Sequence, residues 1–391
     1  MFKAKFESYK DFQNTLGANL TGKLKTDWFF AKSRKYKDCL EASLNSNNIP
    51  NEAYTSLIEQ INNNLPTLHR FLKLKKKMLG LDDLHYYDLY MPIVKSVEMQ
   101  YTVEEGQELL LDVFKPLGEE YVATVKKSFN ERWIDYYPTP GKRSGAYSHG
   151  SAYDEHPYIL MNWVDDYNSL STLAHELGHT MHSYMSNTNQ GFPNASYATF
   201  VAEIASTINE NFLNDYLVEH AKTDDEKLFL LGSYLELLRT TIFRQTSFAE
   251  FEWEIHKRVE NSEPLTGEIM SKIYYDIVKR YYGHDEGICT VDDYITYEWA
   301  YILHFVNYTY YVYQYSTSLI YATAIAEKIK EEGEPAIEKY YHILKGGGSD
   351  YPINLVKKAG VDPLTSEAVD ITIKRMNDTM DQIEEILAKR D

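Results

Sequence analysis

The segment STLAHELGHTMHSYM, residues 171–185, constrains this chain more than any other stretch of its sequence. It contains the pattern H-E-x-x-H at His175, Glu176 and His179, and serine and threonine at its start are typical helix N-cap residues. On an α-helix, two histidines four positions apart lie about 40° apart around the axis, which is close enough to bind one metal ion. The pattern therefore predicts a helix that carries two metal ligands.

Glu176 lies about 100° from His175 around the predicted helix, so its carboxylate can reach a water on the metal without being a ligand. Neutral imidazoles suit zinc, and a catalytic zinc site keeps one position open for water. Zinc lowers the pKa of that water towards about 7, and a neighbouring glutamate can accept its proton during attack on a carbonyl group. We predict zinc as the cofactor and Glu176 as a general base. On this pattern alone, a packed helix with incidental histidines remains an alternative.

A third ligand distinguishes the types of site that H-E-x-x-H can form. The longer pattern H-E-x-x-H-x-x-G-x-x-H fails, because His182 and Met185 stand where it requires glycine and histidine. The other type takes a glutamate from a following helix, and Glu203 lies 24 positions beyond His179 among apolar neighbours. A carboxylate is costly to bury there unless it is paired with a charge or a metal. We therefore predict Glu203 as the third ligand.

Three residues near the motif have roles that the pattern does not decide. His182 lies one turn too far along the helix to join a tight ligand set, so we expect it to pack or to support the site. Glu210 shares a helix face with Glu203 and either supports the site or faces solvent. Gly178 costs a helix roughly 1 kcal/mol relative to alanine, which predicts close packing of this helix against a neighbour.

The rest of the sequence is mostly helical in pattern. Residues 49–81 have apolar residues at helical spacing, and residues 102–133 open with Thr102 and Glu105 as a capping box. Residues 134–164 are rich in Pro, Gly, Ser and Tyr, and we predict two antiparallel strands near Ser144–His149 and Tyr158–Trp163. The predicted fold is mainly α, with one small antiparallel sheet just before the helix that carries the motif.

Composition argues against several classes of protein. The formal net charge is −18 and there is no long basic run, which argues against nucleic acid as a partner. Cys39 and Cys289 cannot build a disulfide framework or a thiolate metal cluster. We see no signal peptide and no membrane span, so we expect a cytoplasmic protein with no membrane partner.

Several segments together resemble the oligoendopeptidase F branch of the thimet oligopeptidase family of zinc peptidases. The resemblance rests on TLAHELGHTMHS and FVAEIASTINE and extends to GKRSGAYS, HPYILMNW, RQTSFAEFEWEIH, HFVNYTYYVYQYSTS and GGGSDYP, so it covers most of residues 35–365. It implies a zincin-like helical fold and one zinc ion held by His175, His179 and Glu203, with Glu176 as general base. It also implies oligopeptides as substrates, because the family encloses its substrate channel.

The same resemblance implies that His304, Tyr310 and Tyr313 face the scissile carbonyl. A phenol can donate a hydrogen bond to the oxyanion of a tetrahedral intermediate. The chain has 34 tyrosines, so a packing role for this pair is the open alternative. His304 and Tyr310 fall on different faces of an ideal helix, and we therefore expect a backbone break near Asn307.

The segment KRSGAYS is expected to supply an edge strand on which a peptide lies, although an ordinary hairpin strand is also compatible with it. We expect residues 1–391 to form one catalytic unit, with 1–130 as the helical portion of an upper lobe and 131–391 as the zinc-bearing portion. Compared with the family, the N-terminal region is expected to be missing, as in a fragment or a short member.

The sequence thus predicts a zinc metalloendopeptidase that hydrolyses internal bonds of oligopeptides. A zinc carboxypeptidase with the same metal motif is the nearest alternative, and it needs a group such as Arg239 or Arg244 to hold the terminal carboxylate of its substrate. A non-catalytic peptide-binding fragment is the alternative from a different class of protein.

Overall fold

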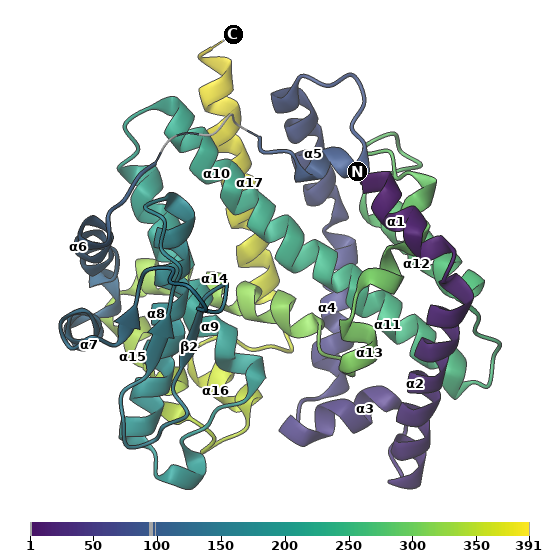
Figure 1. Ribbon diagram of the computed structural model, residues 1–391, viewed down its shortest axis with the longest axis horizontal. Coiled ribbons are helices and arrows are strands. Elements are labelled where there is room, and N and C mark those ends of the chain that lie inside the picture. The colour runs from purple at the N-terminus through teal and green to yellow at the C-terminus, as the bar shows by residue number, and fades with distance from the viewer. Residues whose placement is uncertain (1, 94–96, 98, 391) are drawn as a thin grey trace. The chain divides into compact units, whose positions relative to one another are not determined.

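The computed structural model describes residues 2–93, 97 and 99–390 (Figure 1). The chain divides into two compact units: unit 1 is Met1–Lys95 with Leu235–Ser316, and unit 2 is Ser96–Tyr234 with Thr317–Asp391. The helices between residues 103 and 130 belong to unit 2, and the expectation of one catalytic unit stays a prediction. Helices dominate both units, so the predicted mainly α class is confirmed.

The secondary-structure elements of unit 1 are helices, together with one isolated β-bridge between His85 and Thr290 among the described residues. Its α-helices are α1 (Phe2–Lys10), α2 (Gln13–Ser33), α3 (Cys39–Leu44), α4 (Asn51–Asn63), α5 (Leu65–Leu79), α11 (Arg244–Glu260), α12 (Gly267–Tyr281) and α13 (His304–Asn307). Its short helices are the 3-10 helices η1 (Asn45–Asn47), η2 (Tyr86–Tyr90) and η6 (Asp293–Tyr301) and the π-helix η5 (Arg239–Phe243). Helices α2, α11 and α12 pack against one another.

Unit 2 contains the sheet. Its helices are α6 (Val103–Val113), η3 (Lys115–Leu117), α7 (Glu119–Asn130), α8 (Tyr167–Asn189), η4 (Phe192–Asn194), α9 (Thr199–Glu219), α15 (Glu334–Gly346), α16 (Pro352–Lys358) and α17 (Glu367–Ala388). Two more helices belong to both units. The chain passes from unit 2 to unit 1 within α10 (Asp224–Leu238) and returns to unit 2 within α14 (Tyr313–Glu332). Helix α8 is central to unit 2, because α7, α9, α15 and the sheet all contact it.

The two long predicted helices are each broken by a proline. Residues 49–81 contain α4 and α5, with Asn64 between them and Pro66 in the first turn of α5. Proline lacks an N–H group and clashes with the preceding turn, so a continuous helix through residue 66 is excluded. The capping box of Thr102 and Glu105 is confirmed, but its helix ends before Pro116.

The sheet has the strand order β1-β3-β2, with β1 (Ile134–Asp135), β2 (Tyr147–His149) and β3 (Tyr158–Leu160). Strands β2 and β3 are antiparallel and pair Ser148 with Ile159, which confirms the predicted hairpin pair, although both strands are shorter than predicted. Strand β1 is parallel to β3 and was not predicted, because two residues carry no detectable alternation. The sheet is therefore mixed, and β2 is one of its edges.

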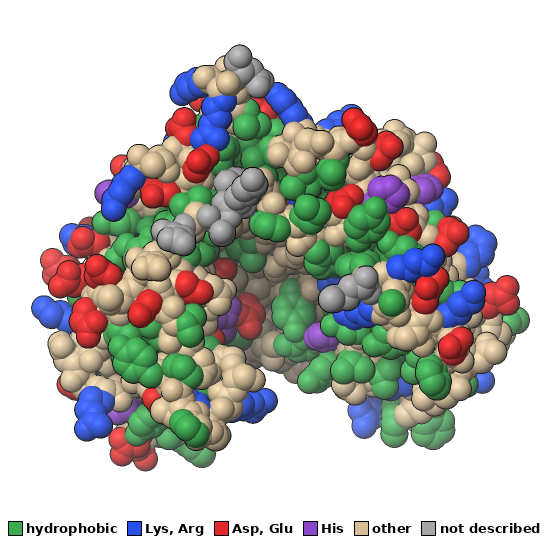
Figure 2. All heavy atoms as spheres, turned by 45° about the horizontal axis from the view of Figure 1, so that its top comes forward, with side chains coloured by type: hydrophobic (Ala, Val, Ile, Leu, Met, Phe, Trp, Pro, Cys, Tyr) green, Lys and Arg blue, Asp and Glu red, His purple; other side chains and the backbone are tan. Residues whose placement is uncertain are grey.

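Acidic and basic side chains are interspersed on one face of the molecule. On the face that Figure 2 shows, Lys and Arg side chains lie among Asp and Glu side chains. Cys39 and Cys289 are both buried and free. None of the described helices is both long enough and apolar enough to cross a membrane.

Unit 1 buries a carboxylate next to a constrained backbone position. Glu252 on α11 is 2% exposed, and its Oε1 accepts a hydrogen bond of 2.7 Å from the backbone N–H of Tyr310. The φ angle of Tyr310 is +52°, a backbone conformation that residues other than glycine rarely adopt. Burial raises the pKa of Glu252 to about 7, although His256 one turn later acts in the opposite direction.

We predict that Glu252 makes the stability of unit 1 depend on pH. The folded chain keeps the proton that the unfolded chain loses near pH 4.3, so the free energy of unfolding falls as pH rises from about 4.5 to 7. The loss attributable to Glu252 amounts to up to about 3 kcal/mol. Urea unfolding at several pH values should show a flatter profile for Glu252→Gln than for the wild type. Glu254→Gln, on the same helix, is the control, and equal slopes for all three proteins would contradict the prediction.

Candidate metal centre

The H-E-x-x-H segment lies within α8, whose N-cap is Asp166 rather than Ser171. The Asp166 side chain accepts a hydrogen bond from the backbone N–H of Ser169, so the helix starts one turn earlier than predicted. This start places His175 and His179 in the middle of a 23-residue helix. Their rings lie 4.9 Å apart between centroids and almost at right angles. Both rings therefore stand on a rigid element.

Helix α9 packs directly on α8 at Gly178. A Cβ atom added to Gly178 would lie 2.5 Å from both the carbonyl oxygen of Ala205 and the Cα of Ser206. The amide of Asn209 on α9 also donates a hydrogen bond of 2.9 Å to the carbonyl of Ala174 on α8. The close packing predicted from Gly178 is confirmed, and it brings the first turns of α9 beside the two histidines.

Glu203 on α9 completes a group of three ligand atoms. Its Oε2 lies 3.5 Å from Nε2 of His175 and 3.3 Å from Nε2 of His179. Within the described part of the chain, these three residues are the group of His, Cys, Asp and Glu atoms that is compact enough to hold a metal ion. Burial raises the pKa of Glu203, but the two histidines outweigh burial and hold it at about 2. The carboxylate is therefore charged and available as a donor.

The spacing of these atoms suits zinc. Ligands about 2.0–2.1 Å from a tetrahedral ion lie about 3.4 Å from one another, which matches both distances to Glu203. Two imidazoles and one carboxylate form a donor set of the catalytic kind, in which a fourth position stays open.

Glu210 determines which ring nitrogen of His175 donates a hydrogen bond and which faces Glu203. The Oε1 atom of Glu210 lies 2.5 Å from Nδ1 of His175. An ionised carboxylate can only accept a hydrogen bond, so Nδ1 of His175 is the donor. The other ring nitrogen, Nε2, faces Glu203. Burial lowers the pKa of His175, but the hydrogen bond and charge of Glu210 outweigh it and raise the pKa to about 9. The sequence left open whether Glu210 supports the site or faces solvent. In the structure it contacts His175, one of the predicted ligands.

Glu176 is buried on α8 with 7% of its surface exposed. Burial raises its pKa, and the charges of His175 and His179 and the backbone N–H of Ser148 on β2 act against this effect. The contact with Ser148 was missed in the sequence, because nothing in a short strand signals which backbone group will meet a helix. Ser206, which donates a hydrogen bond of 2.8 Å to Glu203, was also missed, although its i+3 spacing was visible.

His182 is fully buried and stacks on Tyr197, with 3.6 Å between the ring centroids. Burial lowers its pKa to about 3, so the ring is neutral. Tyr197 in turn pairs its hydroxyl with Ser183 at 2.9 Å. These contacts show that His182 is a buried packing residue and not one of the grouped ligand atoms.

The three remaining predicted residues belong to unit 1. As expected, the backbone breaks after Asn307, where α13 ends. The His304 ring lies near the rings of Tyr308, Tyr311 and Tyr315, with Nε2 3.2 Å from the Tyr315 hydroxyl.

Tyr310 and Tyr313 are only 2% and 1% exposed. The rings of both lie edge-on against Tyr54, and Tyr310 also stacks on His256. The structure therefore gives both tyrosines packing partners within unit 1, and their part in a reaction stays a prediction.

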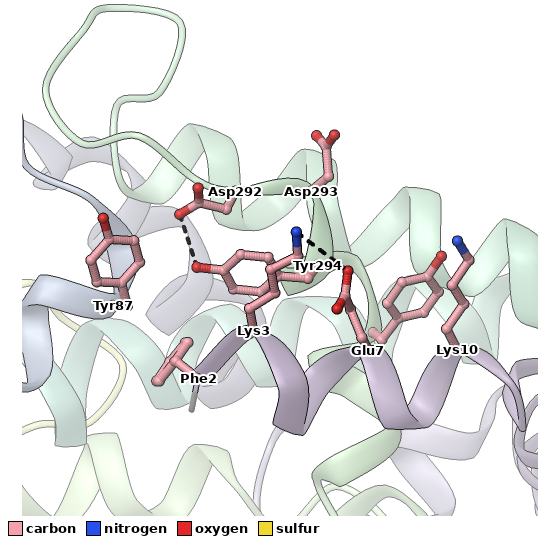
Figure 3. Close-up of a pocket in the computed structure, with 9 residues that line it drawn as sticks. Phe2, Lys3, Glu7, Lys10, Tyr87, Asp292, Asp293 and Tyr294 are labelled. Atoms are coloured by element: carbon pink, nitrogen blue, oxygen red, sulfur yellow. Dashed lines mark hydrogen bonds and ion pairs between the residues drawn. The ribbon is translucent and has the colours of Figure 1, made fainter.

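A separate cavity of about 680 Å³ lies in unit 1, where α1 packs beside η6. Figure 3 shows the hydroxyl of Tyr294 hydrogen-bonded to Asp292 from the same segment of the chain, and Lys3 paired with Glu7 on α1. None of the predicted site residues lines this cavity.

The sequence of the chain matches peptidase family M3 over residues 1–375. The chain belongs to peptidase family M3. It is 45% identical over 388 residues to the oligopeptidase PepF of Bacillus subtilis (strain 168), a match that covers 99% of this chain and 57% of that protein. The predicted resemblance to oligoendopeptidase F is thereby confirmed.

Solved structures show the same fold. A crystal structure from Chlamydophila abortus superposes with a TM-score of 0.92 at 38% identity, covering 98% of this chain and 64% of that one. The oligoendopeptidase F structure from Enterococcus faecium superposes with a TM-score of 0.78 at 35% identity, covering 99% and 63%. The chain therefore spans less than two thirds of the length of these M3 relatives.

We predict that Gly178 is required for the contact between α8 and α9. Gly178→Ala places a methyl group against backbone atoms that cannot move alone, which costs about 1–3 kcal/mol of stability and weakens metal binding. Gly22→Ala on α2 is the matched control, because a Cβ there meets no atom within 4 Å and helix propensity improves by up to about 1 kcal/mol. Urea unfolding of both variants decides, and equal stability changes would contradict the prediction.

We predict that Glu210 strengthens metal binding through His175. Glu210→Ala removes the acceptor of Nδ1 and should weaken zinc affinity about 10–100-fold. Glu210→Gln should retain most of the affinity, because an amide oxygen still accepts the hydrogen bond. Competition with a zinc-binding dye measures both, with Glu219→Gln at the exposed end of α9 as control. Unchanged affinity in the alanine variant would exclude this role.

Proposed function

We propose that this chain carries the catalytic part of a zinc metalloendopeptidase that hydrolyses internal bonds of oligopeptides. The observation that carries the proposal is the compact donor set of His175, His179 and Glu203, with a buried glutamate next to the first histidine. Membership of peptidase family M3 and the names of the relatives support peptides as substrates.

The two histidines and Glu203 would hold the zinc ion, and Glu210 would orient His175. Bound zinc supplies a Lewis acid that polarises the carbonyl group and lowers the pKa of water. Glu176 accepts a proton from water as the water oxygen attacks the carbonyl carbon, and it gives this proton to the amine nitrogen as the C–N bond breaks. Burial suits Glu176 to this task, since a raised pKa makes it a stronger base.

Strand β2 is a suitable place for the peptide backbone. It is an edge of the sheet, and the N–H of Ser148 at its centre lies against the carboxylate of Glu176. An extended peptide that adds to this edge gains main-chain hydrogen bonds and passes the general base. For His304, Tyr310 and Tyr313, a role in stabilising the oxyanion rests on the resemblance alone.

The carboxypeptidase alternative receives no support from its two candidate arginines. Arg239 is 1% exposed and pairs with Glu236, and Arg244 lies 2.5 Å from the buried carboxylate of Glu298. Both guanidinium groups thus already have carboxylate partners within unit 1. The alternative of a non-catalytic fragment predicts less than one zinc ion per chain and no cleavage that chelators abolish.

The decisive experiment compares the zinc-loaded wild type with Glu176→Gln on an internally quenched peptide blocked at both ends. We expect chelator-sensitive cleavage by the wild type, one zinc ion per chain in both proteins, and a loss of turnover of about 10²–10⁴-fold in the variant. Turnover of the variant near the wild-type rate would overturn the role of Glu176. Cleavage of free-ended peptides alone would favour the carboxypeptidase.

A further inference from the structure

Strand β2 and the loop after it follow one face of α8 away from Glu176. Ser148 Oγ lies 2.8 Å from Oγ1 of Thr180, one turn beyond Glu176. The next contact is at Gly150, where an added Cβ would lie 2.2 Å from the Cβ of Ser183. The carbonyl of Gly150 then accepts a hydrogen bond of 3.0 Å from the amide of Asn187. The edge strand is therefore fixed to the helix at successive turns, starting at the general base.

A cavity of about 260 Å³ lies beside this contact, within unit 2. Its walls come from β2 and the loop after it, from α8, and from the segment between α8 and α9. Hydroxyl groups dominate the lining, and they belong to Ser148, Ser151, Tyr153, Ser183, Ser196 and Tyr197. This volume is sufficient for one side chain of an amino acid.

The lining is polar, and the described residues in it include the imidazole of His149 but no Lys, Arg, Asp or Glu. The hydroxyls of Ser183 and Tyr197 lie 2.9 Å apart, and because one donates to the other, a second O–H remains free to donate elsewhere. A charged side chain in this cavity would lose water without meeting a Lys, Arg, Asp or Glu partner among the lining residues. An apolar side chain would leave hydroxyl groups without partners.

The place of the cavity along α8 indicates which substrate residue it meets. Ser183 is seven residues beyond Glu176, so the two lie about 10 Å apart along the helix axis, which equals about three residues of an extended peptide. Antiparallel pairing is the more stable arrangement for a peptide added to β2. Because β2 runs from Glu176 towards Gly150, an antiparallel peptide has its N-terminal side at the cavity.

We propose that this cavity binds the side chain of the second or third residue before the cleaved bond and selects uncharged hydrogen-bonding side chains such as Ser, Thr, Asn and Gln. The proposal rests on the function proposed above and adds a substrate preference to it. The selecting groups are the hydroxyls of Ser183, Tyr197 and Ser196 and the amide of Asn187.

The test uses the zinc-loaded protein and internally quenched peptides with blocked ends, varied at each of the three positions on both sides of the cleaved bond. We expect the second or third position before the bond to prefer Asn, Gln, Ser and Thr over Leu, Asp and Lys by about three- to tenfold in kcat/KM. The corresponding positions after the bond should show no such preference for polar side chains.

Ser196→Asp supplies the second part of the test, because Ser196 is exposed at the cavity and tolerates a larger side chain. The new carboxylate should raise the relative kcat/KM of peptides with Lys at the selected position by about fivefold or more. Ser151→Asp repeats the test from the loop after β2, where Ser151 is also exposed. Ser8→Asp on α1, an exposed serine in unit 1, is the matched control and should leave the ranking of peptides unchanged.

The outcomes separate the two proposals. Cleavage of blocked peptides with no preference before the bond, and no change of ranking in Ser196→Asp and Ser151→Asp, overturns the role of the cavity while the peptidase function stands. Absence of chelator-sensitive cleavage by the zinc-loaded wild type overturns the function and the cavity proposal with it. Circular dichroism melting curves identify any variant that fails to fold. If either Ser196→Asp or Ser151→Asp does not fold, the ranking of peptides by the other variant tests the proposal.

Discussion

The contact of α8 with α9 at Gly178 is the interaction on which the candidate metal centre depends. Two of the proposed ligands stand on α8 and the third on α9, so the distances between them are set by how closely the helices approach. Any side chain at Gly178 would separate the helices and draw Glu203 away from both imidazoles. One missing methyl group therefore determines whether three residues act as one site.

Burial and charge act together around these ligands. Glu203 keeps its charge because two imidazoles face it, and His175 is held by carboxylates on either side of its ring. An isolated carboxylate at this depth would favour the neutral form. The imidazoles and carboxylates compensate one another's charge, whereas each of these groups would be costly to bury without its partners.

Much of this site was readable in the sequence, for stated physical reasons. The four-residue spacing of the histidines, the apolar surroundings of Glu203 and the glycine inside a helix each correspond to a contact in the structure. Helix breaks at Pro66 and Pro116 and the short parallel strand β1 were not predicted. The periodic pattern continues across such prolines, and a strand of two residues is too short to show alternation. The contact of Ser148 with Glu176 depends on tertiary packing and leaves no local signal.

Glycines fix α8 from two sides. Gly178 brings α9 against one side of the helix, and Gly150 brings the loop after β2 against another at Ser183. A helix held in this way cannot rotate about its own axis without collisions of backbone and Cβ atoms. The packing of unit 2 therefore sets the directions of the two imidazoles in advance, so that little conformational entropy would be lost on binding of a metal ion.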